Sequence, residues 1–190
     1  MITNMNVILS NETKGMYNAI GKSLLKLGLH MDYNAKKQVY NNKIYSDVER
    51  ILMDEVEEQL YLVYSDIINR GVIKLLTKVR NNNTLVAVNS EYPSRYQRAI
   101  IHHLNLGTIA DGWYSYDSLH SNMSVINTIM RNHKIGDVNK VAYVGDTLLD
   151  IKRGNEVGCG LVIGVSKRNK NIFKSAGADF VLGDITDLAK

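Results

Sequence analysis

The stretch that decides the fold runs from Val141 to Ile151 and reads VAYVGDTLLDI. Its opening run, Val141–Val144, is continuously apolar and predicts a buried strand, and the residues from Thr147 onward predict a helix. A buried strand that leads directly into a helix is the repeating unit of parallel α/β folds. The stretch also carries two carboxylates four residues apart, Asp146 at the predicted strand end and Asp150 one helical turn later.

The same alternation of strand and helix continues on both sides of this stretch. The expected strands cover residues 85–88, 110–113, 141–144, 161–165 and 180–182, and the expected helices cover residues 93–104, 123–133, 147–157 and 171–176. Met5–Leu9 is one more candidate strand, which we expect to join the same sheet. The pattern predicts an α/β fold, a doubly wound, Rossmann-like parallel sheet with helices on both faces.

Between the first candidate strand and residue 85, the apolar residues recur at helical spacing instead. We therefore predict a small helical insertion, the cap, at residues 14–66, on a core built from residues 1–13 and 67–190. Many of the 11 tyrosines fall in this insertion. They either pack the cap on the core or form a binding face, because tyrosine is enriched in interfaces.

The composition excludes several classes of protein. With 190 residues, 45% of them hydrophobic, 22% charged and a single proline, the chain is expected to form a globular core. No apolar run approaches the roughly 18 residues of a membrane-spanning helix. Met1–Leu9 lacks the basic segment and cleavage site of a signal peptide. The single cysteine, Cys159, cannot form an internal disulfide, so we expect a cytoplasmic protein.

The charge of the chain limits its partners only mildly. Lysine and arginine exceed aspartate and glutamate by 23 − 19 = 4 residues. This excess suits a phosphorylated ligand and equally suits plain solubility. The chain has no nucleic-acid-binding motif, so we expect no nucleic-acid partner. A protein partner and a homo-oligomer both stay open.

Polar residues follow the predicted strands, at the edge of the sheet where ligands bind in open parallel folds. Asn89 and Ser90 follow one strand, and Asp146 and Asp150 follow another. Mg²⁺ is typically held by one or two carboxylates together with water and phosphate oxygens, which makes the two aspartates a candidate metal site. The alternative is that Asp146 only caps the following helix and Asp150 is solvated.

Further motifs downstream accompany this pair. They are Gly158-Cys159-Gly160 before an apolar strand, Gly164-Val165 at its end, and Ala176-Gly177-Ala178-Asp179 before the last strand. With these motifs and the GDTLLD run at residues 145–150, the chain resembles the haloacid dehalogenase superfamily from Gly71 to Lys190, and more loosely over its whole length. Asn89-Ser90-Glu91-Tyr92-Pro93 and the helical insertion resemble the phosphonatase and phosphoglycolate phosphatase branch.

The resemblance implies Mg²⁺-dependent phosphoryl chemistry on a doubly wound core with a helical cap. In this family an aspartate after the first strand attacks phosphorus, and a second aspartate two residues later acts as general acid and base. Ser90 matches the hydroxyl residue that holds a phosphate oxygen, next to Asn89. Asp146 matches the metal ligand and Asp150 its partner.

The first motif of the family is not matched. If the first strand ends at Leu9, either Asn11 and Thr13 or Ser10 and Glu12 occupy the two aspartate positions. Neither register supplies an aspartate nucleophile, and an amide is not a competent one. Glu12 as an unconventional base stays an alternative.

The third motif, where the family has a lysine or arginine, reads His120-Ser121-Asn122-Met123-Ser124 and has no such residue in register. Phosphoryl transfer depends on an aligned nucleophile and on cancelling the charge of the transferred group. We therefore expect a catalytically degenerate protein, with at most weak Mg²⁺ binding, that acts by binding a phosphorylated ligand or a protein partner. The alternative is an active Mg²⁺-dependent hydrolase of a small phosphorylated metabolite.

Overall fold

The structure is a computed structural model. It describes residues 1–8, 19, 22–23, 25–26, 54–55, 58–59, 70–90, 94–115 and 125–189. Among these residues, no helix is long and apolar enough to span a membrane.

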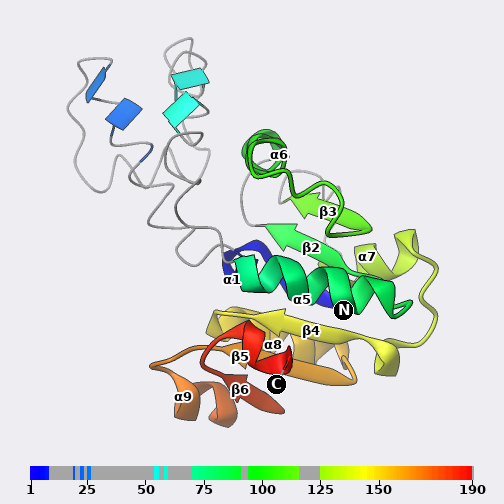
Figure 1. Ribbon diagram of the computed structural model, residues 1–190. Helices are drawn as coiled ribbons and strands as arrows, with labels where there is room; N and C mark the ends of the chain where they lie inside the picture. The colour runs from blue at the N-terminus through cyan, green and yellow to red at the C-terminus, as the bar shows by residue number, and fades with distance from the viewer. Residues whose placement is uncertain are drawn as a thin grey trace.

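A six-stranded sheet forms the centre of the described fold (Figure 1). Its strands, in chain order, are β1 (Ile2–Asn4), β2 (Ala87–Ser90), β3 (Gly112–Ser115), β4 (Ala142–Gly145), β5 (Leu161–Val165) and β6 (Phe180–Leu182). They lie in the order β3-β2-β1-β4-β5-β6, and every neighbouring pair is parallel. The chain therefore winds outward in one direction from β1 to β3 and in the other from β4 to β6. This is the predicted doubly wound α/β architecture.

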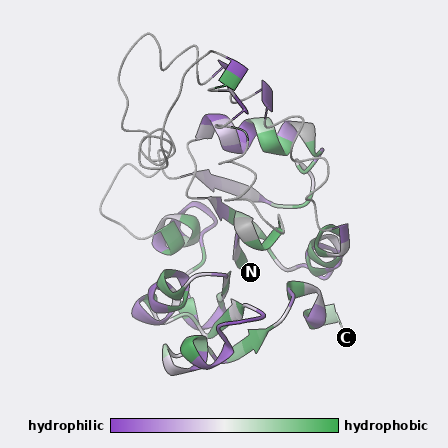
Figure 2. Ribbon diagram, turned by 90° about the vertical axis from the view of Figure 1, so that its left-hand side faces the viewer, coloured by the Kyte–Doolittle hydropathy of each residue, from purple (hydrophilic) through white to green (hydrophobic). Residues whose placement is uncertain are grey.

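Helices cover both faces of the sheet. They are α1 (Met5–Ile8), α5 (Arg70–Asn81), α6 (Ser94–His103), α7 (Val125–Asn132), α8 (Leu148–Val157) and α9 (Lys170–Ser175), with the 3-10 helices η2 (Val138–Lys140) and η3 (Ile185–Ala189). On one face, α1, α5 and α6 bury their apolar residues with Val88 and Val144. On the other face, residues of α7 pack with Ile2 and Tyr143. Figure 2 shows the helices carrying hydrophobic and hydrophilic residues on different sides, as this two-sided burial requires.

The first strand corrects one expectation. The apolar run Met5–Leu9 was expected to be a strand, but β1 is Ile2–Asn4 and Met5–Ile8 is the helix α1. The strand lies in the middle of the sheet, where Thr3 and Asn4 are both buried. Because two of its three residues are polar, hydropathy points past it to the more apolar helix that follows. The first sheet exit therefore lies at Asn4, not after Leu9.

The remaining strands agree with the expected ranges or shift by one or two residues. The strands at residues 161–165 and 180–182 are confirmed without change. The strand expected at 85–88 is found at Ala87–Ser90, and the one expected at 110–113 at Gly112–Ser115. These shifts bring Asn89 and Ser90 into the last two positions of β2.

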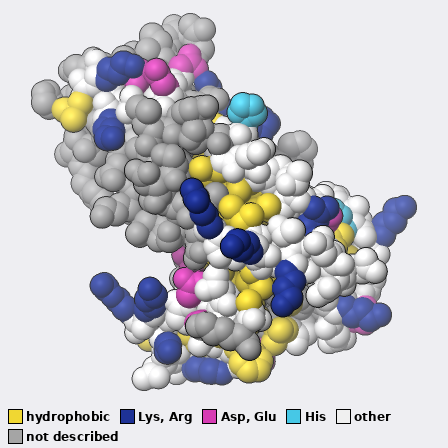
Figure 3. Space-filling model, viewed as in Figure 1, with side chains coloured by type: hydrophobic (Ala, Val, Ile, Leu, Met, Phe, Trp, Pro, Cys, Tyr) yellow, Lys and Arg dark blue, Asp and Glu magenta, His cyan; other side chains and the backbone are white. Residues whose placement is uncertain are grey.

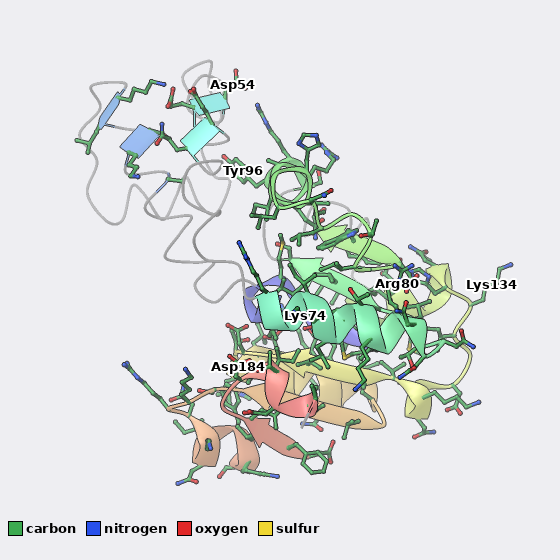
Figure 4. The ribbon with its side chains drawn as sticks, in the orientation of Figure 1. Asp54, Lys74, Arg80, Tyr96, Lys134 and Asp184 are labelled. Atoms are coloured by element: carbon green, nitrogen blue, oxygen red, sulfur yellow. The ribbon has the colours of Figure 1, made fainter. Side chains whose placement is uncertain are left out.

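Most of the cap predicted at residues 14–66 lies outside the described residues. Within the part that is described, Lys26 forms ion pairs with Glu55 at 2.9 Å and Glu58 at 3.0 Å. Asp54 forms a further ion pair with Arg95 in the first turn of α6. Figure 4 shows Asp54 on the same side of the molecule as α6. Two segments of the predicted insertion therefore contact each other, and one of them contacts the core next to β2.

The outer strand β6 carries an exposed aromatic side chain. Phe180 is 58% exposed, and the ammonium group of Lys174 in α9 lies 5.6 Å from the centre of its ring. At that separation a cation is attracted to the face of an aromatic ring. The lysine thus covers part of the apolar surface at this end of the sheet.

Candidate functional site

Polar side chains converge where β1, β2 and β4 end. The neighbours β1 and β4 are the two strands from which the chain winds in opposite directions. In open parallel sheets, this reversal creates a crevice beyond the carboxyl ends of the strands, where ligands bind. Asn4, Asn89 and Ser90 end β1 and β2, and Asp146 follows β4. The sheet thus brings three of the predicted site residues to one edge, together with Asn4, which was not predicted.

Asp150 lies in the interior of this site, and its side chain is fully buried. Its Oδ2 accepts hydrogen bonds from the backbone N–H of Thr147 at 3.1 Å and from the Thr147 hydroxyl at 2.8 Å. Its Oδ1 accepts from the hydroxyl of Tyr143 at 3.2 Å. A buried carboxylate is tolerated only when donors satisfy its oxygens. Here these donors are neutral groups of β4 and of the start of α8.

The start of α8 is built around this carboxylate. Thr147 is the N-cap residue, and its hydroxyl also accepts a hydrogen bond from the backbone N–H of Asp150 at 3.1 Å. Together with the return bond from Thr147 N–H, this is a reciprocal capping box. A Cβ at Gly145 would lie 2.2 Å from the Cβ of Asp150, so only glycine fits where β4 meets the helix. The Gly145-Asp146-Thr147 turn therefore fixes the position of Asp150.

Both parts of the alternative interpretation of the two aspartates are wrong. Thr147, not Asp146, caps α8, and Asp150 is buried instead of solvated. Asp146 stands between the strand and the cap, where it is partly exposed. The two carboxylates are therefore in different environments, although their spacing places them one helical turn apart.

Asn4 connects β1 to the same carboxylate. The side chain is 1% exposed, and its Nδ2 lies 3.5 Å from both Oδ1 and Oδ2 of Asp150. A carboxylate can only accept hydrogen bonds, so the amide nitrogen and not the amide oxygen must face it. Asn4 thus adds a third neutral side chain to those that surround Asp150.

Tyr143 extends this network toward β2. Burial raises the pKa of the Tyr143 hydroxyl well above its ordinary value, and the negative charge of Asp150 raises it further. The hydroxyl therefore stays protonated and remains a donor to Asp150 at all ordinary pH values. Asn89 also forms a hydrogen bond with this hydroxyl.

Asn89 and Ser90 are both buried at the end of β2. Asn89 pairs in register with Asn4, so both side chains project from the same face of the sheet. Among the described residues, the buried Oδ1 atom of Asn89 has no hydrogen-bond partner. A buried acceptor without a donor is uncommon, and at the edge of a crevice it offers a position where a ligand hydroxyl can bind.

The other predicted residues of the first and third motifs lie outside the described part of the chain. These are Ser10, Asn11, Glu12 and Thr13, and the run from His120 to Ser124. The end of β1 gives the residues that stand at the first exit instead: Asn4, with Asn6 two residues later in α1. Sequence analysis missed them, although two amides separated by one residue directly after a short β-prone run were a usable signal.

The described residues do not form an evident metal centre. They contain no group of three or more His, Cys, Asp or Glu side chains that would hold a metal ion. The oxygens of Asp150 already accept three hydrogen bonds from Thr147 and Tyr143 and face the amide of Asn4. Such a carboxylate would have to give up these donors to bind Mg²⁺. Asp150 therefore does not fit the ion that the resemblance implies, which leaves Asp146, directly after β4, as the carboxylate at this exit that could contact it.

The chain was compared with protein families and with curated proteins. The model of the haloacid dehalogenase-like hydrolases matches residues 10–163, which is more than half of the chain. No curated protein matches it.

Solved structures of similar fold cover nearly the whole chain. CbbY from Rhodobacter sphaeroides, an aspartate-to-asparagine mutant in complex with xylulose-(1,5)-bisphosphate, has a TM-score of 0.73 and 13% identity over 98% of this chain and 94% of its own. The predicted HAD-hydrolase YfnB from Bacillus subtilis, bound to magnesium, has a TM-score of 0.71 and 10% identity over 98% of this chain and 95% of its own. The predicted β-phosphoglucomutase from Thermotoga maritima has a TM-score of 0.70 and 16% identity over 95% and 92%. At these identities the similarity shows a common fold.

Proposed function

Because the chain belongs to the haloacid dehalogenase-like hydrolase family, we propose that it binds a small phosphorylated ligand in the crevice beyond β1, β2 and β4 without transferring the phosphoryl group. The observation that carries this proposal is Asn4, which occupies the end of the first strand. The family resemblance implies an aspartate nucleophile at this exit.

The amide of Asn4 lacks the chemistry that the position requires. Formation of an aspartyl-phosphate needs a carboxylate oxygen to attack phosphorus, and an amide oxygen is a poor nucleophile. Asn6 stands two residues later, where the family has its general acid and base, and an amide has no proton to exchange in the ordinary pH range. The carboxylate for the attack on phosphorus and the carboxyl group for proton transfer are therefore both replaced by amides.

The rest of the crevice still suits binding. Ser90 supplies a hydroxyl at the end of β2, in keeping with the family position that holds a phosphate oxygen. The buried Oδ1 of Asn89 can accept a hydrogen bond from a ligand hydroxyl or from a protonated phosphate oxygen. The CbbY mutant supports the proposal from outside, because an aspartate-to-asparagine change in this fold is compatible with a bound bisphosphate.

A turnover assay tests the catalytic half of the proposal. The protein is incubated with Mg²⁺ and a panel of phosphomonoesters, including phosphoglycolate because of the branch that the sequence resembles. We expect phosphate release at the same background rate as in the Asp146→Ala variant. Release that is well above background and disappears in Asp146→Ala would instead establish the alternative, an active Mg²⁺-dependent hydrolase.

Calorimetric titration tests the binding half, with inorganic phosphate and phosphoglycolate as probes. We expect saturable binding that the Ser90→Ala variant weakens by roughly fivefold to tenfold, the effect of one lost hydrogen bond. Ser175→Ala, which removes an exposed hydroxyl at the end of α9, is the matched control and is expected to leave binding unchanged. If no probe binds, the ligand proposal fails, and a protein partner for the degenerate site becomes the hypothesis to pursue by pull-down.

A further inference from the structure

We infer that this crevice works without Mg²⁺, because the amide group of Asn4 compensates the negative charge of Asp150 in place of a cation. The inference extends the proposed function by stating that ligand binding is independent of metal. It concerns the interior of the site, where β1, β4 and the first turn of α8 meet.

The first support is the surroundings of Asp150. Both carboxylate oxygens accept hydrogen bonds, from two groups of Thr147 and from the hydroxyl of Tyr143, at distances between 2.8 and 3.2 Å. Mg²⁺ demands nearly ideal octahedral geometry and binds oxygen ligands at about 2.0–2.1 Å. An ion at Asp150 would have to displace donors that also form the N-cap of α8, so metal binding would compete with the start of the helix. Of the described side chains at this exit, Asp146 alone would then have to hold the ion, with an amide in place of a carboxylate at the end of β1.

The second support is the position of Asn4. Its Nδ2 lies 3.5 Å from each oxygen of Asp150, in a fully buried environment. An aspartate here would place a second carboxylate against the first, and two such groups can stay ionised together only beside a cation. An asparagine of the same shape presents N–H groups instead of a charge. The contact is thus attractive with no ion between the two side chains.

The third support is the charge balance of the site. Relative to the two aspartates that the resemblance implies, Asn4 and Asn6 remove two negative charges, 2 × (−1) = −2. One Mg²⁺ contributes a charge of +2. By charge alone, the pair Asn4 and Asn6 without an ion is therefore equivalent to two aspartates with one Mg²⁺, so these two positions add no repulsion toward a phosphate group.

Thermal unfolding of the protein without any phosphorylated ligand tests the inference. We expect the Tm of the wild-type chain to be the same with millimolar Mg²⁺ and with a chelator. Asn4→Asp is expected to lower the Tm by roughly 4–8 °C in the chelator, because it brings two carboxylates together, and Mg²⁺ is expected to restore most of the loss. Asn171→Asp adds the same charge at an exposed position of α9 and is the matched control, with no Mg²⁺-dependent change.

The opposite results would overturn the inference. If Mg²⁺ raises the Tm of the wild-type chain and the rise disappears in Asp146→Asn, the site is an ordinary metal site. If Asn4→Asp does not fold, metal binding is tested on the wild-type chain alone. The chain is titrated with Mn²⁺, and binding is followed by electron paramagnetic resonance. No binding up to millimolar Mn²⁺ supports the inference, and a saturable site lost in Asp146→Asn contradicts it.

These measurements are separable from those of the proposed function. Turnover that persists in the presence of a chelator would refute ligand binding without catalysis and leave the metal-free site intact. Conversely, Mg²⁺-dependent stability without turnover would refute the metal-free site and leave the proposed function intact.

Discussion

Two carboxylates at opposite ends of the sheet are stabilised in different ways. Asp150, beyond the carboxyl end of β4, is fully buried and surrounded by neutral hydrogen-bond donors. Asp111 immediately precedes β3, and its Oδ1 accepts from Arg80 Nη2 at 2.7 Å and from Nε at 3.0 Å. Its Oδ2 accepts from the backbone N–H of Val86, just before β2, at 2.8 Å. Asp150 accepts its hydrogen bonds from neutral groups, and Asp111 is one half of an ion pair.

The difference separates the end of the sheet that an ion pair stabilises from the end where the candidate site lies. The Arg80–Asp111 pair joins the end of α5 to two strands, and its side chains are 35% and 30% exposed. Figure 4 shows Arg80 toward the end of α5 that lies away from Asp54 and Asp184. Water screens such a pair, so its charges compensate each other at little cost. At the other end, the hydrogen bonds to Asp150 come from the neutral groups of Thr147 and Tyr143.

The space-filling view shows how charged side chains are distributed on one face of the molecule. Lys and Arg side chains are spread across the face seen in Figure 3, with hydrophobic side chains between them. On this face, the positive charge of the described residues is therefore distributed over several elements. Steering of an anionic ligand toward the crevice would come from this broad field.

The largest effect is expected from Asp150→Ala. The substitution leaves the Thr147 N–H and the hydroxyl groups of Thr147 and Tyr143 buried without their acceptor, at a cost of about 3–5 kcal/mol in the free energy of unfolding. Urea denaturation measures the loss. Glu156→Ala, at an exposed position of the same helix, is the control and should change stability by less than about 0.5 kcal/mol. A loss below about 1 kcal/mol for Asp150→Ala would mean that the network contributes little to the fold.

Gly145→Ala is expected to come next. The added methyl group would lie 2.2 Å from Asp150 Cβ and 2.6 Å from its Cγ, so the β4–α8 junction must shift. We expect a loss of about 2–3 kcal/mol by urea denaturation, the usual effect of overpacking a tight site. Gly136→Ala is the matched control, because a Cβ there meets no atom within 4 Å. Equal stability of the two variants would show that the junction is loosely packed.

The stability of the fold at alkaline pH tests the surroundings of Asp150 without removing its carboxylate. Tyr143 has a higher pKa in the folded chain than its ordinary value of 10.0. The stability linked to this shift is therefore fully present below pH 10 and is lost as the pH rises, because the unfolded chain releases the proton first. We compare how much the free energy of unfolding falls between neutral pH and about pH 11. This fall should be roughly 1 kcal/mol smaller for Tyr143→Phe than for the wild-type chain. Parallel stability curves for the two proteins would contradict the shift.

The smallest effect is expected from Arg80→Ala. Because the pair with Asp111 is partly exposed, its removal should cost only about 0.5–1 kcal/mol, and the difference from the wild-type chain should shrink in high salt. Chemical denaturation with urea at low and high ionic strength measures both quantities. A larger, salt-independent loss would place this ion pair in the same class as the buried Asp150.

Much of the fold could be predicted from the sequence, because the buried strands are continuous apolar runs. Leu161–Val165 has this character and was located to the residue. The strand Ile2–Asn4 was missed because Thr3 and Asn4 are polar although fully buried in the central strand of the sheet. Hydropathy records transfer from water, and it cannot show that the Thr3 hydroxyl donates to the backbone carbonyl of Asn4 or that the Asn4 amide faces Asp150.

The candidate site was predicted only in part for the same reason. The sequence placed Asp146 at the end of the strand and Asp150 in the first turn of the helix, and the structure agrees. The spacing could not show that Asp150 turns inward, because its surroundings include Asn4, which lies 146 residues away in the sequence. Asn4 itself escaped notice since its significance follows from where the first strand ends.

The contact between Lys174 and the Phe180 ring on β6 has a consequence for self-association. An outer strand exposes backbone groups to which another copy of the chain can add a strand, and such additions propagate into fibrils. On β6 the strand has only three residues, and the ammonium group of Lys174 stands over the Phe180 ring. A strand added to β6 would have to remove water from the Lys174 ammonium group. The short length of β6 and this charge therefore disfavour pairing between the sheets of two molecules.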